Sequence, residues 1–241
     1  MIDKSRVAMI VGAVIGLGFA ASGVFIGQGL VNFRTGARGV TVRGLAERSV
    51  KGDLAILPIS FTEAGDELTA VQARLDDKTV AVRRFLKTQG YKDAEVDLGK
   101  LSVTDTSAQE YNNKTGGPRF IASQTVVVRT GDVDRVAATT RSLGELVRQG
   151  VVLNNFQGPS YLFTGLNSVR PAMIAEATAS ARSGAEQFAH DSGAHIGGIR
   201  EATQGSFEIL PRDESSNGDN NEASSLWKKV RVVTTVSYRL R

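Results

Sequence analysis

The feature that most constrains the fold is an uncharged stretch near the start of the sequence. Residues 7–33 contain no Asp, Glu, Lys or Arg, and residues 7–31 are mostly Val, Ile, Leu, Ala, Phe and Gly. As an α-helix, this stretch of about 25 residues extends roughly 37 Å, enough to cross a hydrocarbon layer of about 30 Å. The sequence therefore predicts a short tail over 1–6, a transmembrane helix over 7–31 and a linker over 32–38.

A cleaved signal peptide is the alternative interpretation of this stretch. Lys4 and Arg6 make a basic start, and residues 20–22 are small enough for a cleavage site. The apolar core of a signal peptide usually runs for about 7–15 residues, however, whereas this one continues to Val31. We therefore expect an uncleaved signal anchor that contacts the lipid bilayer through residues 7–31.

Small residues recur every fourth position along this predicted helix. Such a face lets two helix backbones approach closely in lipid, where van der Waals contact then favours association. Glycine is also common in membrane helices for other reasons, which is the plain alternative. The positions predicted to pack are Ala8, Gly12, Gly16 and Ala20, followed on a slightly rotated line by Gly23 and Gly27. We expect self-association through this face.

The same window contains a misleading nucleotide-binding pattern. Residues 16–21 fit the form G-x-G-x-x-A. A dinucleotide site needs a strand before this turn and an acidic residue about 20 positions later. The next acidic residue is Glu47, and the window is uniformly apolar. No cofactor site is predicted.

Composition excludes several classes of function. The chain has no cysteine, which excludes a disulfide scaffold, a thiolate zinc site and a cysteine nucleophile. The formal charge is +4, and the basic residues are scattered. Binding of nucleic acid requires a concentrated basic patch, with aromatic side chains for single strands, and neither pattern is present. We expect no nucleic-acid partner.

Hydrophobic periodicity predicts an α+β domain over residues 39–241. Strand patterns alternate with helix patterns, and strand pairs between helices favour antiparallel or mixed pairing with the helices on one face. A polar loop at about 211–226 is predicted to be flexible. Strands are expected near 40–43 and over 54–61, 96–104, 120–129, 151–163, 199–210 and 230–240, the one over 151–163 being interrupted by Gly158 and Pro159. Three helices are expected over about 68–90, 132–149 and 171–192.

Each helix pattern also predicts a buried stripe. The first would bury Leu68, Val71, Leu75, Val82, Phe85 and Leu86, and Gly90 would close it. The second would begin at Asp132 and bury Val133, Val136, Leu143 and Val147. The third would bury a narrow alanine stripe of Ala177, Ala181 and Ala185 together with Phe188.

Two strands carry further predictions. The last strand alternates cleanly, with Val230, Val232, Thr234, Val236, Tyr238 and Leu240 on one face. Pro58 cannot donate to a ladder, which places the strand over 54–61 at an edge or a bulge. We expect these two strands to offer edges that pair between subunits.

The order of these weak signals resembles a known family. The resemblance rests on residues 40–46, on the Ala-rich helix over 175–189 leading into 193–199, on 204–207, and on the last strand. Together they are similar to the SIMPL-domain family, a domain of unknown function, over about residues 38–241. The resemblance implies a bacterial envelope location, on the periplasmic side of the inner membrane when an anchor is present. It also implies that ring-like homo-oligomers form in some members, and links some members to oxidative-stress tolerance. It supplies no catalytic residue.

No arrangement of reactive residues predicts an enzyme. His190 and His195 lack a third metal ligand at suitable spacing, and Ser183, His190 and Asp191 come without the G-x-S-x-G elbow of a hydrolase. The carboxylate pairs at 76–77 and 213–214 are typical of solvated charges, and the cluster at 228–231 of a strand start. We expect no catalytic, metal or cofactor site.

We therefore expect a single-pass inner-membrane protein whose domain is periplasmic and assembles into a scaffold or enclosure. Support of envelope or oxidative-stress tolerance would be its role. The basic residues that flank the predicted helix do not settle its orientation. The alternative is a periplasmic module that binds a small ligand, a peptide or a lipid between its helices and sheet.

Overall fold

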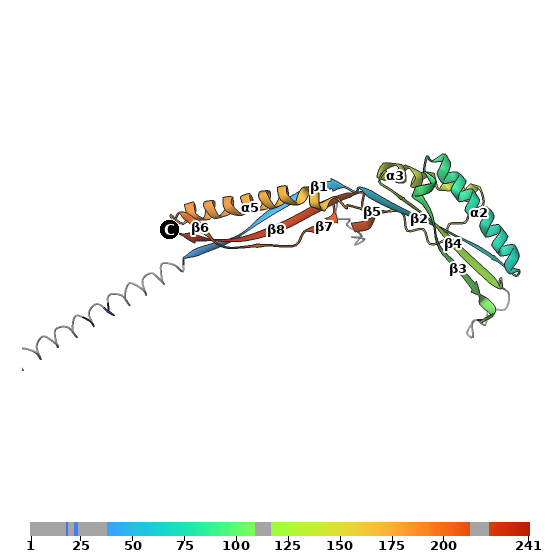
Figure 1. The fold of residues 1–241 in the computed structure, drawn as a ribbon, viewed down its shortest axis with the longest axis horizontal. Coiled ribbons are helices and arrows are strands. Elements are labelled where there is room, and N and C mark those ends of the chain that lie inside the picture. Colours follow the sequence, from blue (N-terminus) through green and yellow to red (C-terminus); the bar gives the residue numbers. More distant parts are fainter. Residues whose placement is uncertain (1–17, 19–21, 24–37, 109–116, 213–221) are drawn as a thin grey trace, which may run out of the picture. The chain divides into compact units, whose positions relative to one another are not determined.

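A computed structural model describes residues 18, 22–23, 38–108, 117–212 and 222–241 (Figure 1). Of the predicted transmembrane helix, only residues 18, 22 and 23 are described, and all three are helical. Ala8, Gly12, Gly16, Ala20 and Gly27 lie outside the described residues. No helix among the described residues is both long enough and apolar enough to cross a membrane.

The chain divides into two compact units. The first holds residues up to Ala46 together with Pro171–Phe207 and Val232–Arg241, and the second holds Glu47–Arg170 and Glu208–Arg231. Strands in both units pair antiparallel, as the strand-pair pattern predicts. The fold is therefore α+β, in agreement with the sequence.

The second unit is built on a four-stranded sheet. Its strands are β2 (Leu54–Gly65), β3 (Val96–Asp105), β4 (Phe120–Thr130) and β5 (Ser160–Leu162), in the spatial order β3-β4-β2-β5. Residues alternate between buried and half-buried along β2 and β4, the period that one covered face imposes. This unit also contains three short 3-10 helices: η1 (Asp93–Glu95), η2 (Thr106–Ala108) and η3 (Glu222–Ser224).

Helix α2 (Leu68–Thr88) packs against β2 and β4 in this unit (Figure 1). It buries Val71, Leu75, Val82, Phe85 and Leu86, so the predicted stripe is confirmed except at Leu68, which is exposed. Gly90 follows the helix at φ 86°, a left-handed conformation that glycine adopts readily, and it donates to the Lys87 carbonyl at 3.0 Å. The predicted end of the helix is thus confirmed.

The single helix predicted over 132–149 is wrong. The structure has two helices, α3 (Val133–Ser142) and α4 (Gly144–Arg148). Asp132 caps α3 by accepting from the Arg135 amide at 3.1 Å. The break near Leu143 changes the helical phase, so Leu146 is buried and the predicted Val147 is exposed.

The first unit is smaller and has an alanine-rich core. Strands β1 (Gly39–Lys51), β8 (Trp227–Leu240) and β6 (Ile196–Gln204) lie in that order, and β7 (Glu208–Pro211) pairs with the β8 residues that belong to the second unit. Helix α5 (Leu166–Asp191) runs along β1 and β8 (Figure 1). The core residues are Val40, Ala181, Ala185, Val236 and Tyr238.

Helix α5 differs from its prediction at both its start and its stripe. It begins at Leu166, before Pro171, and the helix accepts this proline with the loss of one intrahelical hydrogen bond. The alanine stripe is confirmed and continues to Ala189, whereas Phe188 is 51% exposed.

The predicted strand over 151–163 is shorter in the structure, and the one over 199–210 is divided in two. Of the stretch 151–163 only Ser160–Leu162 is a strand, because Asn155 and Gly158 adopt positive φ angles of 48° and 85° that no ladder accommodates. The stretch 199–210 forms the separate strands β6 and β7, with residues 205–207 between them.

Candidate functional site

Strand β3 carries an exposed apolar surface at one edge of the second unit's sheet. Its residues Leu98, Leu101 and Val103 are 54%, 49% and 45% exposed. In the order β3-β4-β2-β5, β3 has a partner strand on one side only. We name these three side chains the β3 strip.

A β-bulge brings the three side chains to one face. Leu98 lies opposite Val126, Leu101 opposite Gln124 and Val103 opposite Ala122, so Gly99 and Lys100 together face one residue of β4. In a regular strand, residues 98 and 101 would point to opposite faces because their spacing is odd. With the extra residue, all three lie on the same face as the buried residues of β4.

Gly99 fits the close approach at this bulge. A Cβ at this position would lie 3.1 Å from a Val127 methyl group and 3.3 Å from the Thr125 carbonyl oxygen. The side-chain amide of Gln124 donates to the Gly99 carbonyl at 3.3 Å. The bulge is therefore a fixed part of the sheet.

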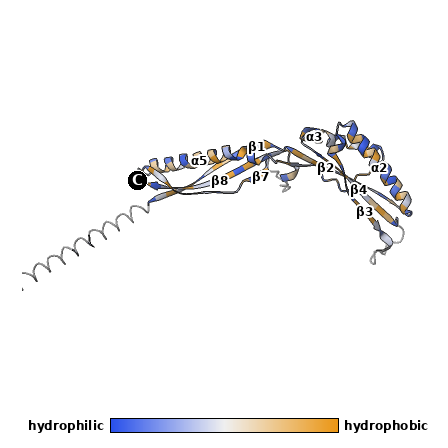
Figure 2. Cartoon of the chain, in the orientation of Figure 1, coloured by the Kyte–Doolittle hydropathy of each residue, from blue (hydrophilic) through white to orange (hydrophobic). Residues whose placement is uncertain are grey.

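The β3 strip is exposed because helix α2 covers β2 and β4 but does not extend over β3. Helix α2 packs on β2 and β4 and makes at most isolated contacts with β3. Its buried face meets the core, which extends from Val126 and Val128 through β2. The strip thus continues the apolar face of the sheet beyond its cover, and orange positions recur along β3 and β4 in Figure 2.

The opposite face of the same sheet carries paired hydroxyl side chains of β2 and β4. The hydroxyl groups of Ser60 and Thr125 are 2.8 Å apart, and those of Thr62 and Ser123 are 2.9 Å apart. Hydroxyl pairs across a sheet face are satisfied in contact with water. Apolar exposure in this sheet is therefore concentrated on one side, where a further surface would bury it.

The sequence predicts sheet edges at the terminal strand and at the strand over 54–61, and the two predictions have different outcomes. The terminal strand β8 is wrong as an edge, because it lies between β1 and β6. Strand β2 lies between β4 and β5, yet β5 pairs only with Leu54–Ile56. The Ser60 carbonyl accepts a hydrogen bond from the Asn154 amide, so the backbone groups of Ser60 point away from β4. Pro58 lies two residues earlier, and its backbone therefore points to the same side. Its missing N–H thus removes no hydrogen bond with β4.

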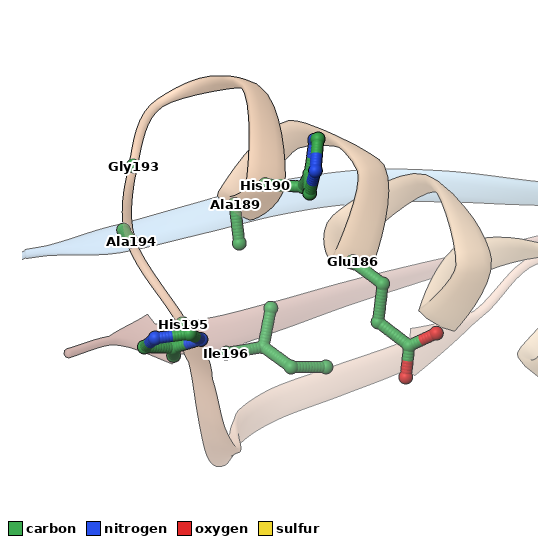
Figure 3. A pocket seen from close by; sticks show the side chains of 7 residues that line it. All are labelled: Glu186, Ala189, His190, Gly193, Ala194, His195 and Ile196. Atoms are coloured by element: carbon green, nitrogen blue, oxygen red, sulfur yellow. The ribbon is translucent and has the colours of Figure 1, made fainter.

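The histidines line a shallow hollow in the first unit but do not converge. The hollow has a volume of about 450 Å³ and is lined by Glu186, His190 and His195 among others. Figure 3 shows the His190 ring and the Glu186 carboxylate pointing in opposite directions. The Nδ1 atom of His190 lies 3.2 Å from a carboxylate oxygen of Asp191. The Glu186 carboxylate accepts a hydrogen bond of 2.9 Å from Nε of Arg182. No group of three metal-ligating side chains occurs among the described residues.

The basic cluster at 228–231 lies at the start of β8, as predicted. The Lys228 side chain is fully buried in the second unit, where its ammonium lies 3.2 Å from the Glu222 carboxylate and also donates to the Glu222 carbonyl. Asp76 and Asp77 are exposed on α2, as predicted. The carboxylate pair at 213–214 lies outside the described residues.

A family model described as "SIMPL: Protein of unknown function (DUF541)" matches residues 40–238. The match begins one residue into β1 and ends two residues before the end of β8, so it covers both units. No curated protein matches the sequence.

Proposed function

The chain belongs to the SIMPL family, whose function is unknown, and we propose that it is a membrane-anchored protein of the bacterial envelope that assembles with further copies of itself. In this proposal residues 7–31 form the uncleaved anchor in the inner membrane, and the domain lies in the periplasm. The assembly acts as a scaffold or enclosure that supports envelope or oxidative-stress tolerance, and the protein is not an enzyme.

The anchor is supported by the sequence alone. An uncharged stretch over 7–33 is longer than a signal-peptide core and has the length of a membrane span. The spacing of Gly12 and Gly16 on its small-residue face adds a second means of association in lipid.

The observation that carries the assembly is the β3 strip. Three large apolar side chains lie half exposed in a row on the edge strand, directly beside the core of the second unit. A strip of this kind next to an open sheet edge marks an interaction surface. The covering partner in this proposal is a second copy of the chain.

The bulge decides how that copy would bind. Lys100 and the irregular spacing at Gly99 disfavour the addition of a regular strand along the backbone of β3. The apolar side chains remain available on the face of the sheet. The interface is therefore formed by packing on the β3 strip, with the backbone edge left to solvent.

The test is the mass of the full chain in detergent, measured by size exclusion with light scattering. We expect one discrete species of several protomers of 25.6 kDa each. The double variant Leu101→Lys, Val103→Lys places two charges on the β3 strip and should reduce the mass to that of a smaller species.

Val80→Lys is the matched control. Val80 is 55% exposed on α2, so the change is chemically similar but lies away from the strip. It should leave the mass unchanged. A wild-type chain of one protomer would overturn the assembly proposal, and a double variant that keeps the full mass while folded would overturn the β3 strip as its interface. The monomeric result would favour a module that binds a small ligand, a peptide or a lipid.

A further inference from the structure

Four arginines gather where β1 begins and β8 ends in the first unit. Leu240 donates its amide to the Arg38 carbonyl at 3.2 Å, and Arg241 exchanges two backbone hydrogen bonds of 2.8 Å with His195. A Cβ on Gly197 would lie 3.3 Å from the Arg239 Cβ and 3.4 Å from the Arg241 Nε. These contacts place the ends of three strands together.

Arg200 joins this group from β6. A Cβ on Gly39 would lie 3.2 Å from an Arg200 guanidinium nitrogen, so this side chain reaches the start of β1. We name the four residues the arginine surface: Arg38, Arg200, Arg239 and Arg241. All four are exposed, and none forms an ion pair with an acidic group in the part of the chain that the structure describes.

The acidic groups nearby do not neutralise this surface. Glu186 accepts from Arg182 at 2.9 Å, and Asp191 accepts from Gln187 and lies beside His190. Glu201 lines a small hollow with Arg200 and is the remaining acidic neighbour. The surface therefore keeps a net positive charge.

An apolar side chain adjoins the arginines. A hollow of about 730 Å³ is lined by Arg38, Phe188, Ser192, Leu240 and Arg241 among others, and Phe188 is 51% exposed. An aromatic side chain beside several arginines has the composition of a surface that lies at a lipid–water interface.

Chain length brings this surface close to the proposed membrane. Arg38 follows Val31 by seven positions, and an extended chain covers at most about 25 Å over that distance. We propose that the arginine surface binds the phosphate headgroups of anionic phospholipids in the membrane that holds the anchor. This inference rests on the proposed anchor at residues 7–31.

The chemistry of arginine suits this partner. A guanidinium group donates two parallel hydrogen bonds to a phosphate and stays charged at all physiological pH values. Each basic residue close to an anionic leaflet shifts the equilibrium toward the bound state by about fivefold at moderate ionic strength. Four such residues change the ratio of docked to free domain by on the order of several hundredfold.

The test uses the full chain in nanodiscs, with a single label. The sequence has no cysteine, so Ser192→Cys supplies a single thiol for an environment-sensitive fluorophore. Ser192 lines the same hollow as Arg38 and Arg241, beside the arginine surface. Ser180→Cys is the control label, exposed on α5 and about 18 Å along the helix. The nanodiscs contain phosphatidylcholine alone or with about one third phosphatidylglycerol.

We expect a blue shift at position 192 with the anionic lipid, a smaller shift at position 180, and loss of the shift in about 1 M salt. Replacing the four arginines of the surface by Gln should abolish it. The charge-matched control should retain it, with Gln at four exposed arginines of the second unit: Arg83, Arg84, Arg141 and Arg148.

The outcomes separate the two proposals. A chain that leaves the nanodisc in alkaline carbonate overturns the anchor, and this inference with it. A chain that stays inserted while the label at 192 ignores the anionic lipid overturns this inference alone. A fluorescence shift that persists after the four arginines are replaced also overturns this inference alone.

Discussion

Gly44 of β1 lies directly against the backbone of Ala177 in α5. A Cβ on Gly44 would overlap the Ala177 carbonyl oxygen and would lie 2.8 Å from the Ala181 Cβ. The alanine stripe of α5 and this glycine together let helix and strand approach more closely than larger side chains permit. The first unit depends on this contact because its core contains few large side chains.

Gly44→Ala should therefore destabilise the first unit strongly. The added methyl group meets helix backbone, which cannot move aside, so we expect a loss of about 3 kcal/mol in the free energy of unfolding. Gly184→Ala is the control, because Gly184 lies in the same helix with nothing within 4 Å. It should gain about 1 kcal/mol from helix propensity. Equal effects of the two changes in urea unfolding would contradict the close contact.

Local periodicity explains what the sequence predicted correctly. The alternation over Val230–Tyr238 requires only that one face of a strand be covered, and every second residue there is buried. The alanine stripe of α5 likewise depends on helical spacing alone. The family resemblance, which rests on the order of such elements, is confirmed over residues 40–238.

The remaining features depend on contacts between distant segments. The pattern over 96–104 predicts a strand, but only the strand order and the bulge at Gly99 expose Leu98 and Leu101 on one face. The burial of Lys228 depends on its contacts with Glu222, which a strand pattern over 228–231 does not predict. Because the helix breaks before Gly144, Leu146 is buried in place of the predicted Val147. A periodicity that assumes one continuous helix does not predict this change.

Removing the carboxylate partner of Lys228 should cost stability. Glu222→Gln removes the negative charge beside this buried ammonium and leaves neutral acceptors at residue 222, the side-chain amide oxygen and the backbone carbonyl. Loss of a partner from a fully buried pair costs about 3–5 kcal/mol, and because Glu222 is 37% exposed we expect about 2 kcal/mol. Glu186→Gln, in the exposed pair with Arg182, should cost less than about 0.5 kcal/mol. Thermal unfolding of both variants distinguishes them, and similar losses would contradict the burial of Lys228.

Glu95 should make stability fall in acid. The backbone amide of Lys92 lowers the pKa of this carboxyl below its ordinary 4.5, and the Thr130 hydroxyl and Arg135 lower it further. A depressed pKa means that the ionised group stabilises the fold at neutral pH and that this contribution is lost as pH falls through the folded pKa. Glu95→Gln should therefore be about 1.5 kcal/mol less stable than wild type at pH 7.

The difference between wild type and Glu95→Gln should shrink as the pH falls below 4.5. Urea unfolding at a series of acidic pH values measures this convergence. Thr130→Val, which removes one hydrogen bond to the carboxylate, should show the same trend with a smaller amplitude. A difference that stays constant across the series would show that Glu95 acts by packing alone.

The small-residue face of the predicted anchor gives the last prediction. Gly12→Ile with Gly16→Ile fills the face on which two helices would approach, so the full chain should lose association that depends on lipid or detergent. Gly18→Ile adds the same side chain about half a turn away from that face and is the matched control. Light scattering of the full chain beside a chain of residues 34–241 separates the two routes to assembly. A large mass in both, unaffected by the double change, would assign assembly to the soluble domain and the β3 strip. A large mass in the full chain only, lost in the double variant and kept in the control, would assign it to the helix.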